Sequence, residues 1–302
     1  MQSPQHLSPY RGRFAPSPTG PLHFGSLVAA LGSYLDARRH GGNWLVRMED
    51  LDRQREVPGA ADAILRTLDA FGFEWDGQIF YQSRRTAAYA DALDQLRSSG
   101  LLFACACSRS EIAHRGRRGP EGPIYPGTCR NGLPQGRNPR ALRVRIRSSP
   151  IGFNDRIQGQ VHQDLAREIG DFVLRRADGL HAYQLAVVVD DACQGITQVV
   201  RGADLVLSTP RQIYLQQQLR LPTPQYGHLP LALDAAGRKL SKAEAAAPID
   251  PHNPLPSLLR AWAFLNQNPF PEPPGDRGEF WSHALASWQM ARVPGVGGRA
   301  GI

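Results

Sequence analysis

The chain has few of the features that mark secreted or membrane proteins. Its 302 residues include only four cysteines, and no apolar run approaches the roughly 20 residues needed to span a bilayer. The first residues, MQSPQHLSPY, lack the basic and apolar regions of a secretory leader. We therefore expect a cytoplasmic protein without a membrane partner or a disulfide framework. Any cysteines that cluster should bind a metal or carry redox chemistry.

The sequence also has fewer acidic than basic residues. The sequence has 35 lysines and arginines against 27 aspartates and glutamates, a net charge of +8, and most of the basic residues are arginine. Arginine favours planar, bidentate contacts to phosphate and carboxylate groups, so a polyanionic partner is one explanation. A genome rich in GC, which favours arginine codons, is the other, and charge alone does not decide between them.

Residues 11–33, RGRFAPSPTGPLHFGSLVAALGS, predict a strand, a tight turn and a helix. Ser26 stands where a helix cap is expected, just before apolar residues at helical spacing. The amides and partial positive charge of the helix start would form an anion site, against which His23 can place its imidazole. The turn contains residues that fix the backbone or allow close approach: Pro16, Pro18, Gly20, Pro21 and Gly25.

A second apolar stretch, NWLVRM at residues 43–48, predicts a buried strand that ends in Glu49 and Asp50. Side chains at the carboxyl end of a parallel strand commonly reach a ligand site. A solvated acidic loop is the alternative interpretation.

Three of the four cysteines fall within residues 102–130, where helical spacing gives way to glycine, proline and arginine. Cys105, Cys107 and Cys129 supply three thiolates, one fewer than a closed tetrahedral zinc site usually takes. His114 is a candidate for the fourth ligand by donor type. Three unrelated buried thiols remain the alternative, because free cysteine often behaves as a small hydrophobe.

Arginines crowd the same region. Residues 141–146, ALRVRI, alternate like a half-exposed strand, so a small sheet is expected to carry some of them. Such density favours a face that contacts phosphates, whereas a solvated loop is the alternative. The arginines concerned are Arg115, Arg117, Arg118, Arg130, Arg137, Arg140, Arg143, Arg145 and Arg147.

Several of these segments together resemble the class I aminoacyl-tRNA synthetases. HFGS at residues 23–26 resembles their HIGH motif, departing at its second and fourth letters, and the preceding FAPSPTG resembles the glutamyl branch. KLSK at residues 239–242 resembles KMSKS, with alanine in place of the last serine. GDFVLRRADGLHAYQLAVVVDDACQGITQVVRGADL at residues 170–205 resembles a long glutamyl/glutaminyl segment, which is more specific than any four-letter motif.

The resemblance implies roles for individual residues. It makes His23, Lys239 and Lys242 catalytic, and it places ATP against His23, Gly25, Ser26 and Lys242, with Mg²⁺ accompanying the nucleotide. It implies a glutamate site formed by Arg13, Phe14, Ala15, Pro16, Ser17, Glu49, Tyr183 and Arg201. The cysteine segment resembles the insertion of relatives that act on queuosine, in which Cys-x-Cys is completed by Tyr-x-x-x-Cys. This implies one structural Zn²⁺ on Cys105, Cys107, Tyr125 and Cys129, with Tyr125 ahead of His114.

The implied fold is α/β: a class I, Rossmann-like nucleotide-binding core with a zinc-bearing α+β insertion and a short helical C-terminal segment. Helices are expected at 57–73, ended by Gly72, at 84–102 after a Ser83 cap, at 255–265 and at 280–291. The expected units are a first half of the core at 10–101, the insertion at 102–169, a second half at 170–245, a helical segment at 246–293, and flexible tails at 1–9 and 294–302.

Too few residues follow 245 for the separate anticodon-reading domain that glutamyl-tRNA synthetases carry. The chain therefore resembles the glutamyl-queuosine tRNA(Asp) synthetases. This implies activation of L-glutamate by ATP without tRNA, then transfer of glutamate to the queuosine base in the anticodon loop of tRNA(Asp), with no obligate protein partner. The alternatives are a truncated glutamyl-tRNA synthetase acting on tRNA(Glu), and a non-catalytic zinc and RNA-binding module.

Overall fold

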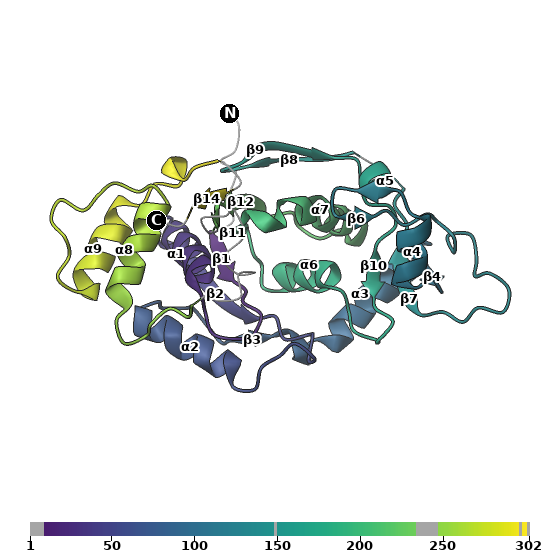
Figure 1. Cartoon of the computed structure of the whole chain (residues 1–302), viewed down its shortest axis with the longest axis horizontal. Coiled ribbons are helices and arrows are strands. Elements are labelled where there is room, and N and C mark those ends of the chain that lie inside the picture. The colour runs from purple at the N-terminus through teal and green to yellow at the C-terminus, as the bar shows by residue number, and fades with distance from the viewer. Residues whose placement is uncertain (1–8, 148–149, 234–246, 296–297, 301–302) are drawn as a thin grey trace, which may run out of the picture.

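A computed structural model describes residues 9–147, 150–233, 247–295 and 298–300. Its centre is a set of parallel strands contributed by two distant parts of the sequence (Figure 1). The first part forms a sheet in the order β1 (Arg11–Phe14), β2 (Asn43–Met48) and β3 (Phe80–Tyr81). The second part adds β11 (Gln198–Gly202) and β12 (Gln225–Leu229).

The two parts meet where β1 lies beside β11. The backbone N–H of Thr197 donates to the carbonyl of Arg11 at 2.9 Å, and the Thr197 hydroxyl accepts from the Arg11 N–H at the same distance. The strands thus follow each other as β3, β2, β1, β11 and β12, an order whose direction changes next to β1. In open α/β sheets of this kind, ligands bind at the carboxyl ends of the strands beside that change.

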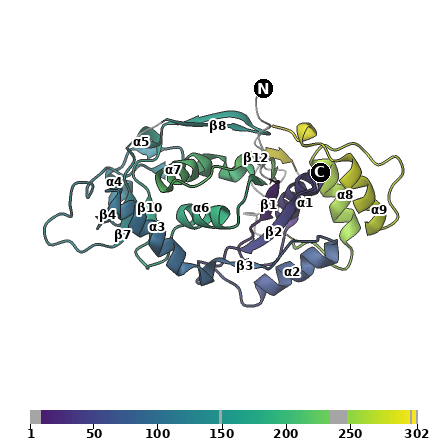
Figure 2. The same cartoon turned by 180° about the vertical axis from the view of Figure 1, so that it is seen from behind.

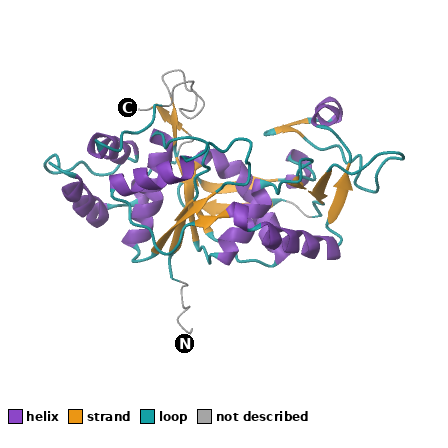
Figure 3. Ribbon diagram, turned by 90° about the horizontal axis from the view of Figure 1, so that it is seen from below, coloured by secondary structure: helices purple, strands orange, loops and turns teal. Residues whose placement is uncertain are grey.

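Helices cover both faces of these strands, as Figure 3 shows from below. Neighbouring residues of β11 enter opposite cores, because Val200 packs into one hydrophobic core and Val199 into the other. The first layer contains α1 (Phe24–Arg39), α2 (Ala60–Phe71), α8 (Pro254–Phe264) and α9 (Arg277–Ser287). The second contains α3 (Thr86–Ser98), α6 (Tyr183–Cys193) and α7 (Thr209–Leu219).

The start of α1 differs from the prediction by three positions. His23, not Ser26, is the capping residue, and its ring Nδ1 accepts from the Ser26 N–H at 3.4 Å. The prediction was wrong because serine is the commoner cap, whereas here an imidazole nitrogen takes the place of the serine oxygen. The cap therefore holds the His23 ring over the first turn.

The other expected helices are present with shifted bounds. Gly72 ends α2 with a positive φ of 84°, which confirms that prediction. Ser83 does not cap α3; it lies in the short helix η1 (Gln82–Arg84), and its N–H and hydroxyl both donate to Asp50. Helix α9 begins earlier than predicted because Asp276 caps it by accepting from the Glu279 N–H at 2.9 Å.

The segment between the two halves extends away from the core, at the opposite end from α8 and α9 (Figures 1 and 2). It contains β4 (Leu102–Cys105), α4 (Arg109–Arg115), β5 (Arg118–Gly119), β6 (Gly122–Pro123), β7 (Ala141–Val144), β9 (Gly159–Gln163) and α5 (Leu165–Glu168). Strand β7 lies between β4 and β10 (Val173–Arg175), which confirms the small sheet. Strand β8 (Ile151–Asp155) pairs with β12, so this segment also reaches the core.

At the other end of the chain, β14 (Gly298–Ala300) pairs in parallel with β13 (Leu231–Leu233), although a flexible tail was expected there. None of the helices in the described part of the chain combines the length and apolar character that a bilayer crossing needs.

Candidate active site

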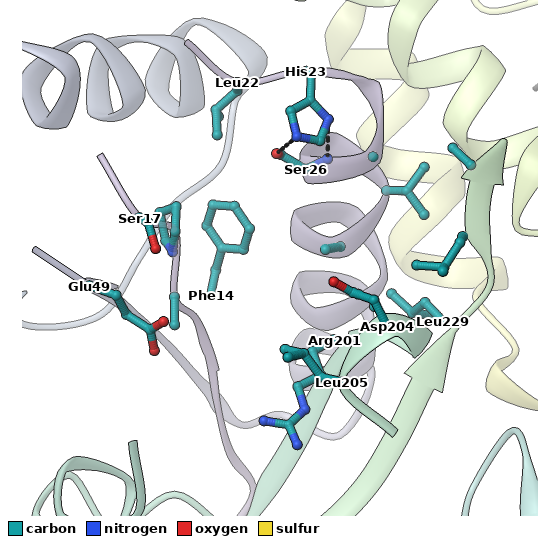
Figure 4. Close-up of a pocket in the computed structure, with 18 of the residues that line it drawn as sticks. Phe14, Ser17, Leu22, His23, Ser26, Glu49, Arg201, Asp204, Leu205 and Leu229 are labelled. Atoms are coloured by element: carbon teal, nitrogen blue, oxygen red, sulfur yellow. Dashed lines mark hydrogen bonds between the residues drawn. The ribbon is translucent and has the colours of Figure 1, made fainter. Parts of the chain in front are cut away.

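A cavity of about 530 Å³ lies at the carboxyl ends of β1, β2, β11 and β12, where the strand order predicts a ligand site. It collects residues that are far apart in the sequence, and Figure 4 shows several of them around it, with His23 and Ser26 at one end and Arg201 at the other. The expected glutamate and ATP residues in the described part of the chain all line it: Arg13, Phe14, Ala15, Pro16, Ser17, His23, Gly25, Ser26, Glu49, Tyr183 and Arg201. Lys239 and Lys242 lie outside the described residues.

One end of the cavity is the start of α1. The His23 ring lies over the first turn, with Nδ1 accepting from the Ser26 N–H and Nε2 3.2 Å from the Ser26 hydroxyl (Figure 4). A Cβ on Gly25 would lie 3.2 Å from the ring, so glycine leaves room for it. The positive end of a 16-residue helix and an imidazole together favour a phosphate here.

The other end of the cavity is cationic. Arg201, on β11, is only 5% exposed, and its Nη1 donates to the Tyr183 hydroxyl at 3.4 Å. Its Nη2 donates to Thr209 and Gln212, each at 2.8 Å. A planar, permanently charged fork fixed in this way suits a carboxylate.

A buried ion network adjoins the cavity, and of its four members only Arg13 and Glu49 were predicted as site residues. Asp191 on α6 accepts from Nε of Arg13 at 3.2 Å and from Nη1 of Arg47 at 2.7 Å, and Nη2 of Arg47 lies 3.6 Å from Glu49. Arg47 is fully buried, and its position inside an apolar strand was the available signal.

The charges in this network shift each other's titration. Burial raises the pKa of Glu49, although Arg47 and Arg13 oppose the shift. Burial alone would also raise the pKa of Asp191, but the charges of Arg13 and Arg47 outweigh it and lower that pKa. Asp191 therefore stays ionised within the network. The negative charge of Glu49 is only partly compensated, so a further cation, such as an ammonium group, would stabilise it.

His228 and Asp155, which were not predicted as site residues, lie behind Arg201. His228 is fully buried on β12, with Nε2 3.1 Å from Nε of Arg201 and Nδ1 2.5 Å from Asp155. Burial lowers the pKa of His228 to about 4, with the charge of Arg201 adding to the shift and Asp155 opposing it. A polar residue within the apolar stretch 226–233 was the only signal for it in the sequence.

The cysteine cluster forms a separate site in the segment between the halves. The Sγ atoms of Cys105, Cys107 and Cys129 lie within 4.8 Å of one another, and those of Cys107 and Cys129 are 3.7 Å apart. The Tyr125 hydroxyl lies 3.6 Å from Sγ of Cys105 and accepts from the Cys129 N–H at 2.7 Å. His114 is exposed on α4 and is not in the cluster formed by the described residues.

The arginine-rich face is smaller than predicted because several arginines are used internally. Arg143 is buried, donates to the Asp171 carbonyl at 2.8 Å and lies over the Tyr125 ring. Arg130 pairs with Asp171, and Arg137 pairs with Glu111. Arg145 is half-buried, with its guanidinium over the Phe103 ring. The exposed arginines are Arg115, Arg117, Arg118, Arg137, Arg140 and Arg147.

Known proteins resemble this chain in both sequence and fold. Residues 10–252 match the family of class I tRNA synthetases (E and Q), catalytic domain. A protein of Dechloromonas aromatica named glutamyl-Q tRNA(Asp) synthetase is 60% identical over 290 residues, covering 95% of this chain and 96% of that protein. A protein of Chromobacterium violaceum with the same name is 58% identical, over 94% of this chain and 95% of its own length.

Among solved structures, a glutamate tRNA ligase from Elizabethkingia meningosepticum in complex with its amino acid superposes with a TM-score of 0.79. It is 26% identical, and the match covers 97% of this chain and 67% of that one. The α/β fold predicted from the sequence is thereby confirmed. The chain belongs to the class I tRNA synthetases of the glutamyl and glutaminyl (E and Q) family, in the group of the glutamyl-Q tRNA(Asp) synthetases.

Proposed function

We propose that this enzyme activates L-glutamate with ATP in the absence of tRNA and transfers it to the queuosine base in the anticodon loop of tRNA(Asp). The observation that carries the proposal is the 60% identity to a Dechloromonas aromatica protein whose name, glutamyl-Q tRNA(Asp) synthetase, refers to that reaction. The match covers 96% of that protein's length. The cavity supports it, because a cationic fork at one end and a helix start at the other suit an amino-acid carboxylate and a phosphate.

In the first step an α-carboxylate oxygen of glutamate attacks the α-phosphorus of ATP, and pyrophosphate leaves. Arg201 and Tyr183 would hold the side-chain carboxylate, and Glu49 would hold the ammonium group. His23 and the start of α1 would stabilise negative charge on the reacting phosphate. Mg²⁺ bound to the nucleotide would neutralise part of the phosphate charge.

Lys239 and Lys242 would stabilise charge on the leaving pyrophosphate. The whole sequence has two lysines, and these are they; the other 33 of its 35 lysines and arginines are arginine. A compact ammonium group on a flexible stem can follow a leaving group, which is difficult for a rigid guanidinium fork.

The cysteine cluster would hold one structural Zn²⁺. Zinc–sulfur bonds of about 2.3 Å in a tetrahedron place the sulfurs roughly 3.8 Å apart, close to the 3.7 Å between Cys107 and Cys129. Bound zinc would make the Tyr125 hydroxyl a phenolate ligand, although burial raises the pKa of that group in the protein alone. The metal would tie β4 to the loop after β6, and thus shape the exposed arginine face for RNA phosphates.

Replacing Tyr125 by phenylalanine is expected to weaken zinc binding about 10- to 100-fold or more, because a ligand is lost and the ring is kept. Replacing His114 by phenylalanine should leave zinc content unchanged. Zinc retained after dialysis against a graded chelator, measured by elemental analysis, checks this. Equal retention in both variants would remove Tyr125 from the ligand set, and loss in the His114 variant alone would put His114 there.

Exchange of labelled pyrophosphate into ATP, with pure protein and no RNA, tests the first step. We expect exchange that depends on glutamate. The second step is tested by supplying labelled glutamate with tRNA(Asp) from cells with and without the queuosine pathway, and with tRNA(Glu). Labelling of tRNA(Glu), or exchange that requires RNA, would overturn the proposal in favour of a conventional glutamyl-tRNA synthetase. A protein with no ATP turnover at all would be a binding module.

A further inference from the structure

Arg201 is held by groups on the side away from the cavity as well as by those that face it. Three neighbouring parallel strands each contribute one buried residue: Arg201 on β11, His228 on β12 and Asp155 on β8. Arg201 and His228 are direct partners in the strand register. The three side chains run across the sheet as a hydrogen-bonded chain, with Arg201 at the end that lines the cavity.

The hydrogen bonds of Arg201 divide its guanidinium into two sides. Nε faces His228, and Nη2 donates to Thr209 and Gln212. Nη1 donates to Tyr183, which lines the cavity. The contact with His228 therefore fixes the rotation of the fork about the long axis of the side chain. It thereby fixes the direction of the one remaining N–H group, on Nη1.

This arrangement requires one protonation state of His228. Arginine has donors only, so Nε2 of His228 must accept, and the imidazole must be neutral with its proton on Nδ1. The Thr209 hydroxyl lies 3.2 Å from the same nitrogen, but it donates to the Leu205 carbonyl at 3.0 Å. Nε2 is thereby left to accept from Arg201.

Asp155 is in turn held as an acceptor for the Nδ1 proton. Its Oδ1 accepts from the backbone N–H groups of Ile157, Gln158 and His228 at 2.9, 2.8 and 3.1 Å. Burial alone would raise the pKa of Asp155, but its bonds to His228 and to these amides lower it. An ionised Asp155 leaves His228 one choice of tautomer.

We propose that His228, oriented by Asp155, is a positioning residue that sets how the cavity recognises the side-chain carboxylate of its amino acid. The inference rests on the proposed glutamate activation and deepens it. Because His228 is neutral, it orients the Arg201 guanidinium without pairing with its charge, which stays available for the substrate carboxylate. A carboxylate in the place of His228 would neutralise that charge. The cavity then discriminates against glutamine, which offers no counter-charge to the cation.

Two substitutions of His228 separate its two hydrogen bonds. In His228→Gln the amide oxygen can take the place of Nε2 and accept from Arg201, while the bond to Asp155 is lost. In His228→Asn the shorter amide can take the place of Nδ1 and donate to Asp155, while the acceptor for Arg201 is lost. Each variant loses one buried hydrogen bond, so the two form a matched pair for stability.

We expect His228→Asn to raise KM for glutamate about 10- to 100-fold in pyrophosphate exchange, because a hydrogen bond to a charged group is lost. The same variant should reduce the preference for glutamate over glutamine by a similar factor. His228→Gln should stay within about threefold of the unsubstituted enzyme in both quantities. KM for ATP should change less than about twofold in either variant, because the nucleotide end of the cavity is untouched.

Equal effects of the two substitutions on glutamate KM, with matching melting temperatures, would overturn the inference and make His228 a packing residue. An equal rise in KM for ATP would do the same. Absence of glutamate-dependent exchange in the unsubstituted enzyme would instead overturn the proposed function, so the two failures are distinguishable. If His228→Asn fails to fold, Asp155→Asn supplies the second measurement, with an expected rise in glutamate KM of about 10-fold.

Discussion

Replacing Arg201 by lysine is expected to lower kcat/KM for glutamate by about a hundred- to a thousandfold in pyrophosphate exchange. Lysine keeps the positive charge but loses the planar fork, together with the bonds that Nε and Nη2 make to His228, Thr209 and Gln212. Misdirecting a buried charge that pairs with a substrate carboxylate costs about 2–5 kcal/mol, which corresponds to a loss of about 30- to 5,000-fold, and the expected value is the middle of this range.

The control for this substitution is Arg66→Lys. Arg66 is an exposed arginine of α2 and does not line the cavity. We expect its kcat/KM to be unchanged, and both variants should bind ATP normally by equilibrium dialysis. An Arg201→Lys enzyme with unaltered kcat/KM for glutamate would mean that this arginine does not hold the amino acid.

Replacing Asp191 by asparagine is expected to lower the free energy of unfolding by about 3–5 kcal/mol, because two buried guanidinium groups lose their shared carboxylate. In this variant the anion nearest to Arg47 in the network would be Glu49, whose carboxylate lies 3.6 Å from the Arg47 guanidinium. Glu49 is a weak substitute because burial raises its pKa. Urea denaturation followed by circular dichroism measures the change as a shift in midpoint at constant m.

Asp94→Asn provides the comparison for Asp191→Asn. Asp94 pairs with Arg97 on the exposed surface of α3, so its loss should change the free energy of unfolding by less than about 0.5 kcal/mol. If Asp191→Asn were as mild as Asp94→Asn, the buried network would contribute nothing to stability.

Local features of this enzyme could be predicted from its sequence. The turn between β1 and α1, the cysteine spacing and the end of α2 at Gly72 depend on residues within a few positions of one another. The error at Ser26 is of the same local kind. Two residues within one turn could cap the helix, and ordinary cap preferences rank serine above histidine.

Partners that meet across the fold could not be predicted in this way. Arg47 and His228 each appear in the sequence as one polar residue in an apolar strand, with nothing to indicate what pairs with them. Their partners, Asp191 and Asp155, lie 144 and 73 positions away. The resemblance to a known family found residues that line the cavity, whereas these supporting residues became visible only once the strands were placed side by side.

The distance in sequence between Arg13 and Asp191 has a consequence for synthesis of the enzyme. The two are 178 positions apart, so a growing chain exposes the first strands long before their counter-ion is made. Closing so long a loop is entropically costly. Until it closes, the guanidinium groups of Arg13 and Arg47 must stay hydrated, because both pair with Asp191. The N-terminal third is thus expected to remain unfolded on the ribosome, and its strands should dock together with α6 in one late, cooperative event.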